Sequence, residues 1–179
     1  LFGLVGALAL AAIGVVRLAV PEAPARVHAG PRGGGRILHP ELLRLNVGIF
    51  VLHVAQMAMF VVLPLRMIDA GLAVSDHWKL YLPVVLASFA LMVPLVLHAD
   101  RRNRPKPVLV GCIVLLIAVE GGLSLAGSIP AYAAGLLVFF VAFNVLEAML
   151  PSLVSRIAPA HARGMAIGVY NTTQTLGIF

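Results

Sequence analysis

Apolar residues are gathered in long blocks along this chain, with short polar segments between them. The blocks cover residues 1–20, 45–65, 80–99, 107–126 and 132–155, and each is about 20 residues long. At about 1.5 Å rise per residue, a helix of that length crosses the roughly 30 Å hydrocarbon core of a bilayer. Strands in lipid would have to close into a barrel and would alternate polar with apolar residues, a pattern that is missing here. The pattern predicts five transmembrane helices, complete or nearly so, and a sixth that begins near Gly164.

The overall composition indicates a membrane protein, and the residues around the first block argue against a signal peptide. Hydrophobic residues make up 61% of the chain and charged residues 11%, and the mean hydropathy is +1.02. The first residue is Leu1 and no basic run precedes the first block, so the block does not resemble a signal peptide. We therefore expect an all-α, multi-pass helix bundle and an internal fragment of a longer protein.

One segment interrupts the apolar blocks with a composition that cannot pack a core. Residues 21–40, PEAPARVHAGPRGGGRILHP, contain four Pro, four Gly and three Arg, which is typical of a flexible linker. The predicted organisation is a transmembrane helix over residues 1–20, a linker over 21–41 and a C-terminal helical bundle over 42–179.

The distribution of basic residues predicts the orientation in the membrane. The connections between the apolar blocks lie alternately on the two sides of the membrane. Eleven of the thirteen Lys and Arg residues fall in or beside the connections of one side, and only Arg66 and Lys79 belong to the other side. Cytoplasmic loops collect Lys and Arg, so segments 21–41, 100–106 and 156–163 are expected to face the cytoplasm. The net charge of +6 does not indicate nucleic acid, because no aromatic residues interleave with the charges.

Polar residues inside the apolar blocks need an explanation, because each is costly in hydrocarbon unless it faces protein or water. Asn46, His53 and Gln56 share one helix face at 100° per residue. Two interpretations are open for this face: hydrogen bonds between helices, or the lining of a wet cavity.

Glu147 is the group in the chain whose burial in hydrocarbon costs the most free energy. Asn144 lies three residues before it on the same helix face. A carboxyl group there is expected to be protonated, paired or facing water, with either a functional role or a structural hydrogen bond. Counting about 1.5 Å per residue places His53 and Glu147 at a similar depth, slightly toward the cytoplasmic side. Our hypothesis is that the two side chains face each other across a cavity, although the sequence supplies depth and helix face but not proximity.

The remaining intramembrane polar groups carry weaker signals. Glu120 is expected to reach outward to the interface or to bond locally. The run from Asn171 to Thr175 is too polar for a lipid-facing helix, and Gly164 with Gly168 form a GxxxG spacing that permits close helix contact. The single cysteine, Cys112, builds no disulfide or metal site, and no nucleotide-binding or hydrolase motif is present. We expect no enzyme activity, no metal and no cofactor.

Two segments resemble a known transporter family. Asp100-Arg101-Arg102-Asn103-Arg104-Pro105-Lys106 resembles the second-half copy of the major facilitator superfamily signature, G-x-x-x-D-R/K-x-G-R/K-R/K, with Val96 and Asn103 in place of its glycines. Residues 143–177, FNVLEAMLPSLVSRIAPAHARGMAIGVYNTTQTLG, resemble helices 10 and 11 of bacterial drug-efflux members, especially the YajR-like inner-membrane transporters.

That resemblance implies a fold and a function for the whole chain. Residues 1–20 would be helix 6 and the next five apolar segments helices 7 to 11, with helices 1 to 5 and 12 lying outside this sequence. Helices 7 and 10 of the family line a central cavity. The signature-like loop, consisting of Asp100, Arg101, Arg102, Arg104 and Lys106, would brace the cytoplasmic face against the other half of the molecule.

The leading hypothesis is a secondary transporter in the bacterial inner membrane, exporting small amphipathic compounds in exchange for protons by alternating access. Glu147 or His53 would carry the proton. Its partners would be lipid, substrate, protons and the N-terminal half of the same protein. A membrane scaffold protein and an uptake carrier of the same family are the alternatives. The candidate substrate contacts are Asn46, Gln56, Asn144, Asn171 and Gln174.

Overall fold

The computed structural model describes residues 2–19, 39–101 and 105–179, which form two separate units. In the first unit, Leu1–Gly33, the described element is helix α1, Phe2–Ala19, which is apolar except for Arg17. Most of the predicted linker at 21–41 lies outside the described residues, and so do Arg102 and Arg104. The interpretation of residues 1–20 as a membrane-spanning helix stays a prediction.

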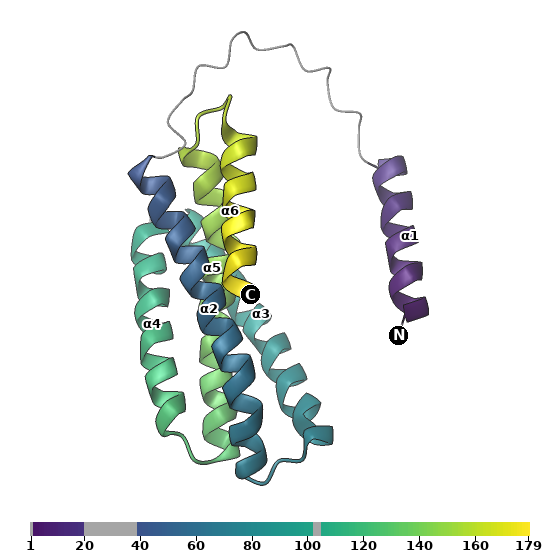
Figure 1. Ribbon diagram of the computed structural model, residues 1–179, viewed down its shortest axis with the longest axis vertical. Coiled ribbons are helices and arrows are strands. Elements are labelled where there is room, and N and C mark those ends of the chain that lie inside the picture. Colours follow the sequence, from purple (N-terminus) through teal and green to yellow (C-terminus); the bar gives the residue numbers. More distant parts are fainter. Residues whose placement is uncertain (1, 20–38, 102–104) are drawn as a thin grey trace. The chain divides into compact units, whose positions relative to one another are not determined.

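The second unit, Gly34–Phe179, is a bundle of helices (Figure 1), and the described residues contain no strand. Four of its helical segments are long and apolar enough to cross a membrane: α2, the stretch Val74–Arg101, α4 and α5. These correspond to the second to fifth apolar blocks, so those predicted spans are confirmed as helices. The bounds are α2 Pro40–Asp69, a short 3-10 turn η1 Val74–Asp76, α3 His77–Arg101, α4 Pro105–Leu125, α5 Ile129–Ile157 and α6 Arg163–Ile178.

Helix α2 begins slightly earlier than the apolar pattern indicates. Pro40 is at the start of the helix, where its missing N–H costs nothing and its fixed φ suits a helix. The ring of His39 accepts a hydrogen bond from the backbone N–H of Glu41, with Nδ1 3.4 Å from the nitrogen. Pro40 and Glu41, the last two residues of the predicted linker, thus belong to the first turn of α2, because the residues at a helix start are polar and carry no apolar signal.

Helix α5 is the centre of the bundle and packs against α2, α3, α4 and α6 (Figure 1). Half of its most apolar window is buried, compared with 6% for α3 and for α4. Phe139 and Phe143 stack with ring centroids 5.9 Å apart, and Leu136 and Val145 are completely buried beside them. A helix whose residues are mostly apolar over several faces belongs in such a central position.

The peripheral helices expose large apolar side chains, which fits a lipid environment. Leu86 and Phe89 of α3 and Ile117 of α4 are 61%, 49% and 70% exposed. Contiguous apolar surface of this kind is rare on proteins that live in water.

Helices α2 and α6 meet at Gly177, where the two backbones approach closely. A Cβ atom on Gly177 would lie 2.6 Å from the backbone oxygen of Phe50 and 3.0 Å from the Cβ of His53. The GxxxG spacing predicts close contact at Gly164 and Gly168 instead, yet a Cβ at either position meets nothing within 4 Å in this structure. Among the described residues the close contact of α6 is therefore at Gly177, because the GxxxG spacing does not indicate which turn of α6 reaches α2.

Candidate functional site

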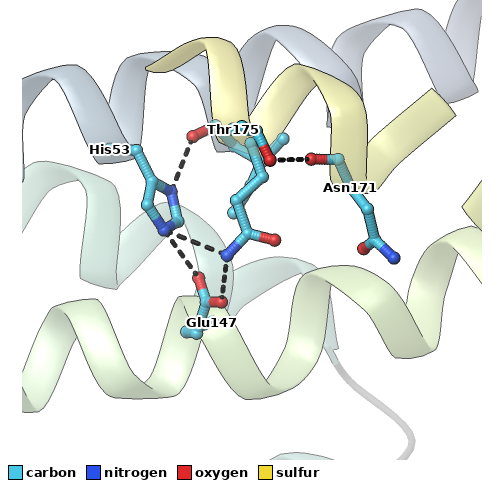
Figure 2. Close-up of polar contacts among 6 residues, drawn as sticks. His53, Glu147, Asn171 and Thr175 are labelled. Carbon is cyan, nitrogen blue, oxygen red and sulfur yellow. Dashed lines mark hydrogen bonds and ion pairs between the residues drawn. The ribbon is translucent and has the colours of Figure 1, made fainter. Parts of the chain in front are cut away.

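Three helices bring one polar side chain each to a common point inside the bundle (Figure 2). His53 comes from α2, Glu147 from α5 and Gln174 from α6. His53 is 4% exposed, and the side chain of Glu147 is 34% exposed. His53 and Glu147 thus lie close together, with Nε2 and Oε2 3.8 Å apart, and Gln174 joins them as a third member. We call these three residues the polar triad.

Both ring nitrogens of His53 have polar partners within hydrogen-bond distance. Its Nδ1 lies 3.1 Å from the carbonyl oxygen of Ile49, and a carbonyl only accepts, so Nδ1 carries a hydrogen. Its Nε2 lies 3.1 Å from the amide nitrogen of Gln174, and that nitrogen only donates. These two contacts fit a ring that carries its hydrogen on Nδ1 and accepts at Nε2. Phe143 packs edge-on against the same ring at a centroid distance of 5.5 Å.

The two carboxylate oxygens of Glu147 differ in their surroundings (Figure 2). Oε1 accepts a hydrogen bond of 2.8 Å from the amide nitrogen of Gln174. Oε2 is buried, has no hydrogen-bond partner within the described ranges, and lies 3.8 Å from Nε2 of His53, too far for a hydrogen bond. A buried carboxylate oxygen without a hydrogen-bond partner costs free energy.

The other predicted contact residues do not join the triad. Asn144 donates a 3.0 Å hydrogen bond from Nδ2 to the hydroxyl of Ser88 on α3, and Ser88 in turn donates to the carbonyl of Val85 at 2.7 Å. Ser88 is completely buried. This α3–α5 link was missed from the sequence, although a lone Ser within an apolar block is the signal that would have indicated it.

Three further candidates lie on α2 and α6, the helices that carry His53 and Gln174. Asn46 and Gln56 are half-buried on α2 and Asn171 is exposed on α6. Within the described part of the chain, none of the three makes a side-chain hydrogen bond. The backbone oxygen of Asn171 accepts from the hydroxyl of Thr175 at 2.9 Å (Figure 2). Their role as substrate contacts stays a prediction.

A family comparison now adds to this geometry. The model of the Major Facilitator Superfamily matches residues 1–179. The chain belongs to this superfamily. It is therefore part of an integral, multi-pass membrane protein of a transporter family, and its family indicates transport rather than enzymatic catalysis.

Curated relatives of this superfamily chain are bacterial. It is 42% identical over 143 residues to the "Inner membrane transport protein YajR" of Escherichia coli (strain K12), covering 79% of this chain and 32% of that protein. It is 30% identical over 144 residues to the "Uncharacterized transporter BU466" of Buchnera aphidicola subsp. Acyrthosiphon pisum (strain APS), covering 80% and 37%. The chain spans about a third of the length of these relatives. No solved structure matches.

The signature-like loop of this superfamily chain makes an ion pair across two helix ends. Arg156 at the end of α5 donates from Nη2 to Oδ1 of Asp100 at the end of α3, over 3.0 Å. Both side chains are more than half exposed. Arg101 and Lys106 are exposed. The sequence motif did not indicate Arg156 as the partner, because residues 56 positions apart carry no local signal.

Replacing Asp100 by asparagine in the full-length transporter is expected to lower the free energy of unfolding by at most about 1 kcal/mol, because the pair is exposed and screened by solvent. Thermal unfolding in detergent measures the loss, which should disappear at high salt. Arg101→Gln at the next position is the control and is expected to change little. A salt-independent loss of several kcal/mol would contradict this view of the pair as a weak surface contact.

Glu120, the other intramembrane carboxyl group, occupies different surroundings. It lines a cavity of about 180 Å³ between α2 and α4 together with Arg66 and Ser124. Its Oε1 is buried and has no hydrogen-bond partner in the described residues, so the expected local bond is not seen there. None of the triad's hydrogen bonds involves Glu120. The described ranges also contain no group of three or more His, Cys, Asp or Glu side chains suited to a metal ion.

Proposed function

We propose that this chain is part of a proton-coupled secondary transporter that exports small amphipathic compounds by alternating access. The polar triad is the observation that carries the proposal. It places an ionisable pair, His53 and Glu147, at the meeting point of three helices in an otherwise apolar bundle. Ionisable groups are rare inside membranes and typically serve ion or substrate pathways.

The roles of the residues follow from the chemistry available to each. Glu147 or His53 carries the proton, because these two are the titratable members of the triad. The remaining polar side chains on the helices that meet there contact the substrate. They are Asn46, Gln56, Asn144, Asn171 and Gln174.

The family supplies the frame for the proposal. The apolar segments from residue 45 onward correspond to helices 7 to 11, and the partners are lipid, protons, substrate and the N-terminal half of the protein. The protein resides in the bacterial inner membrane with segments 21–41, 100–106 and 156–163 facing the cytoplasm, because these segments concentrate the basic residues. Export rests on the likeness of residues 143–177 to drug-efflux members.

Inside-out vesicles containing the full-length transporter test this function. With an acidic lumen, a fluorescent amphipathic dye is expected to accumulate inside while the lumen becomes more alkaline, and a protonophore should abolish both signals. Dye leaving the vesicles together with protons would indicate an uptake carrier. A well-folded protein that moves neither dye nor protons would support the scaffold alternative.

A further inference from the structure

Building on this proposed function, we propose that Glu147 takes the proton on Oε2 and that Gln174 is a positioning residue that keeps His53 neutral while this happens. The hydrogen-bond geometry of the triad carries this assignment. Residue type and depth in the membrane do not distinguish Glu147 from His53 as the proton carrier, and the geometry does. It also gives Gln174 a role other than substrate contact.

Gln174 uses both hydrogens of its amide nitrogen within the triad. One points to Oε1 of Glu147 at 2.8 Å and the other to Nε2 of His53 at 3.1 Å. An amide nitrogen has two hydrogens to donate, so the group is fully used. The bridge therefore needs two acceptors. One is Oε1 of Glu147, and the other is an unprotonated Nε2 of His53.

Protonation of His53 would break this arrangement, whereas protonation of Glu147 would not. A hydrogen on Nε2 of His53 would face the hydrogens of the Gln174 amide, because Nδ1 already donates to the carbonyl of Ile49. Oε2 of Glu147 is buried and free of hydrogen bonds within the described residues. A proton can bind there while all three hydrogen bonds of the triad remain in place.

The helix packing holds Gln174 in position. Gly177 lies three residues after Gln174 on the same face of α6 and sits against the Phe50 carbonyl and the Cβ of His53. Close contact at this turn fixes the distance between α6 and α2, and with it the reach of the Gln174 amide. Among the neighbouring titratable groups, Tyr170 on α6 has a buried hydroxyl with no hydrogen-bond partner within the described residues.

Replacing Gln174 by methionine removes the amide at almost constant volume and tests the assignment in the full-length transporter. Infrared spectroscopy follows the protonated carboxyl band of Glu147, identified by its loss in Glu147→Gln. Nitrogen-15 NMR follows the ring of His53, identified by its loss in His53→Gln. In the native protein, Glu147 is expected to titrate while the ring of His53 stays neutral with its hydrogen on Nδ1.

In Gln174→Met, the affinity of His53 for a proton is expected to rise about five- to tenfold, because the ring loses the hydrogen bond that occupied Nε2. Thr172→Val is the matched control on α6, since the Thr172 hydroxyl bonds to the carbonyl of Gly168 in its own helix. It should leave the titration of His53 unchanged.

Two results would overturn the assignment. One is protonation of His53 together with Glu147 in the native protein, and the other is an unchanged His53 titration in Gln174→Met. Both readouts are independent of transport, so they separate this inference from the proposed function. Failure of proton coupling in vesicles with the expected spectra would refute the transport proposal and leave the positioning role of Gln174 standing.

Discussion

Replacing Glu147 by glutamine in the full-length transporter is expected to abolish proton-driven accumulation of dye while leaving the protein folded. Glutamine has nearly the same shape as glutamate, and its amide oxygen can still accept the bond from Gln174. It has no oxygen that binds and releases a proton between neutral and acidic pH. Dye accumulation in inside-out vesicles measures the first effect, and thermal unfolding in detergent measures the second.

Glu120→Gln is the matched control for this experiment. Glu120 is the other carboxyl group within the apolar blocks, and it lines the cavity with Arg66 rather than contacting the triad. Its replacement is expected to preserve proton-driven transport. Unchanged transport together with lowered stability in Glu147→Gln would show instead that Glu147 is a structural hydrogen-bonding residue, as a scaffold protein would require.

Replacing Gly177 by alanine is expected to lower the free energy of unfolding by about 1 to 3 kcal/mol, the usual cost of forcing an extra methyl group into a packed interior. The new Cβ would lie 2.6 Å from the Phe50 carbonyl oxygen, and backbone atoms within a helix cannot rotate away. Helix α6 must then move away from α2, which also withdraws Gln174 from His53 and Glu147. We therefore expect transport to fall together with stability.

Gly135→Ala provides the comparison for Gly177→Ala. A Cβ at Gly135 also comes very close to a neighbour, but that neighbour is the Cδ2 end of the Leu123 side chain, which can rotate. Alanine also gains about 1 kcal/mol of helix propensity over glycine. Equilibrium unfolding in detergent should show little loss or a small gain for Gly135→Ala. Equal losses in the two variants would contradict the importance of the contact between Gly177 and Phe50.

The positions of the helices were predictable because membrane crossing depends on a property of short segments. Apolar blocks of about 20 residues give the spans, and α2, α3, α4 and α5 cover the second to fifth blocks to within one residue. The similar depth of His53 and Glu147 and the helix face of each also followed from residue count and periodicity, whereas their proximity did not. These are properties of one helix at a time.

The amino-acid sequence by itself thus determined that the chain forms apolar helices, which polar residues lie within them, and that His53 and Glu147 share a depth. Only the tertiary structure decided that Gln174 bridges the pair, that Asn144 turns to Ser88, and that Gly177 rather than Gly168 seats α6 on α2. The physical reason is that periodicity describes rotation about one helix axis. Hydrogen bonds and close packing between helices depend on how several axes are placed together, which no single segment encodes.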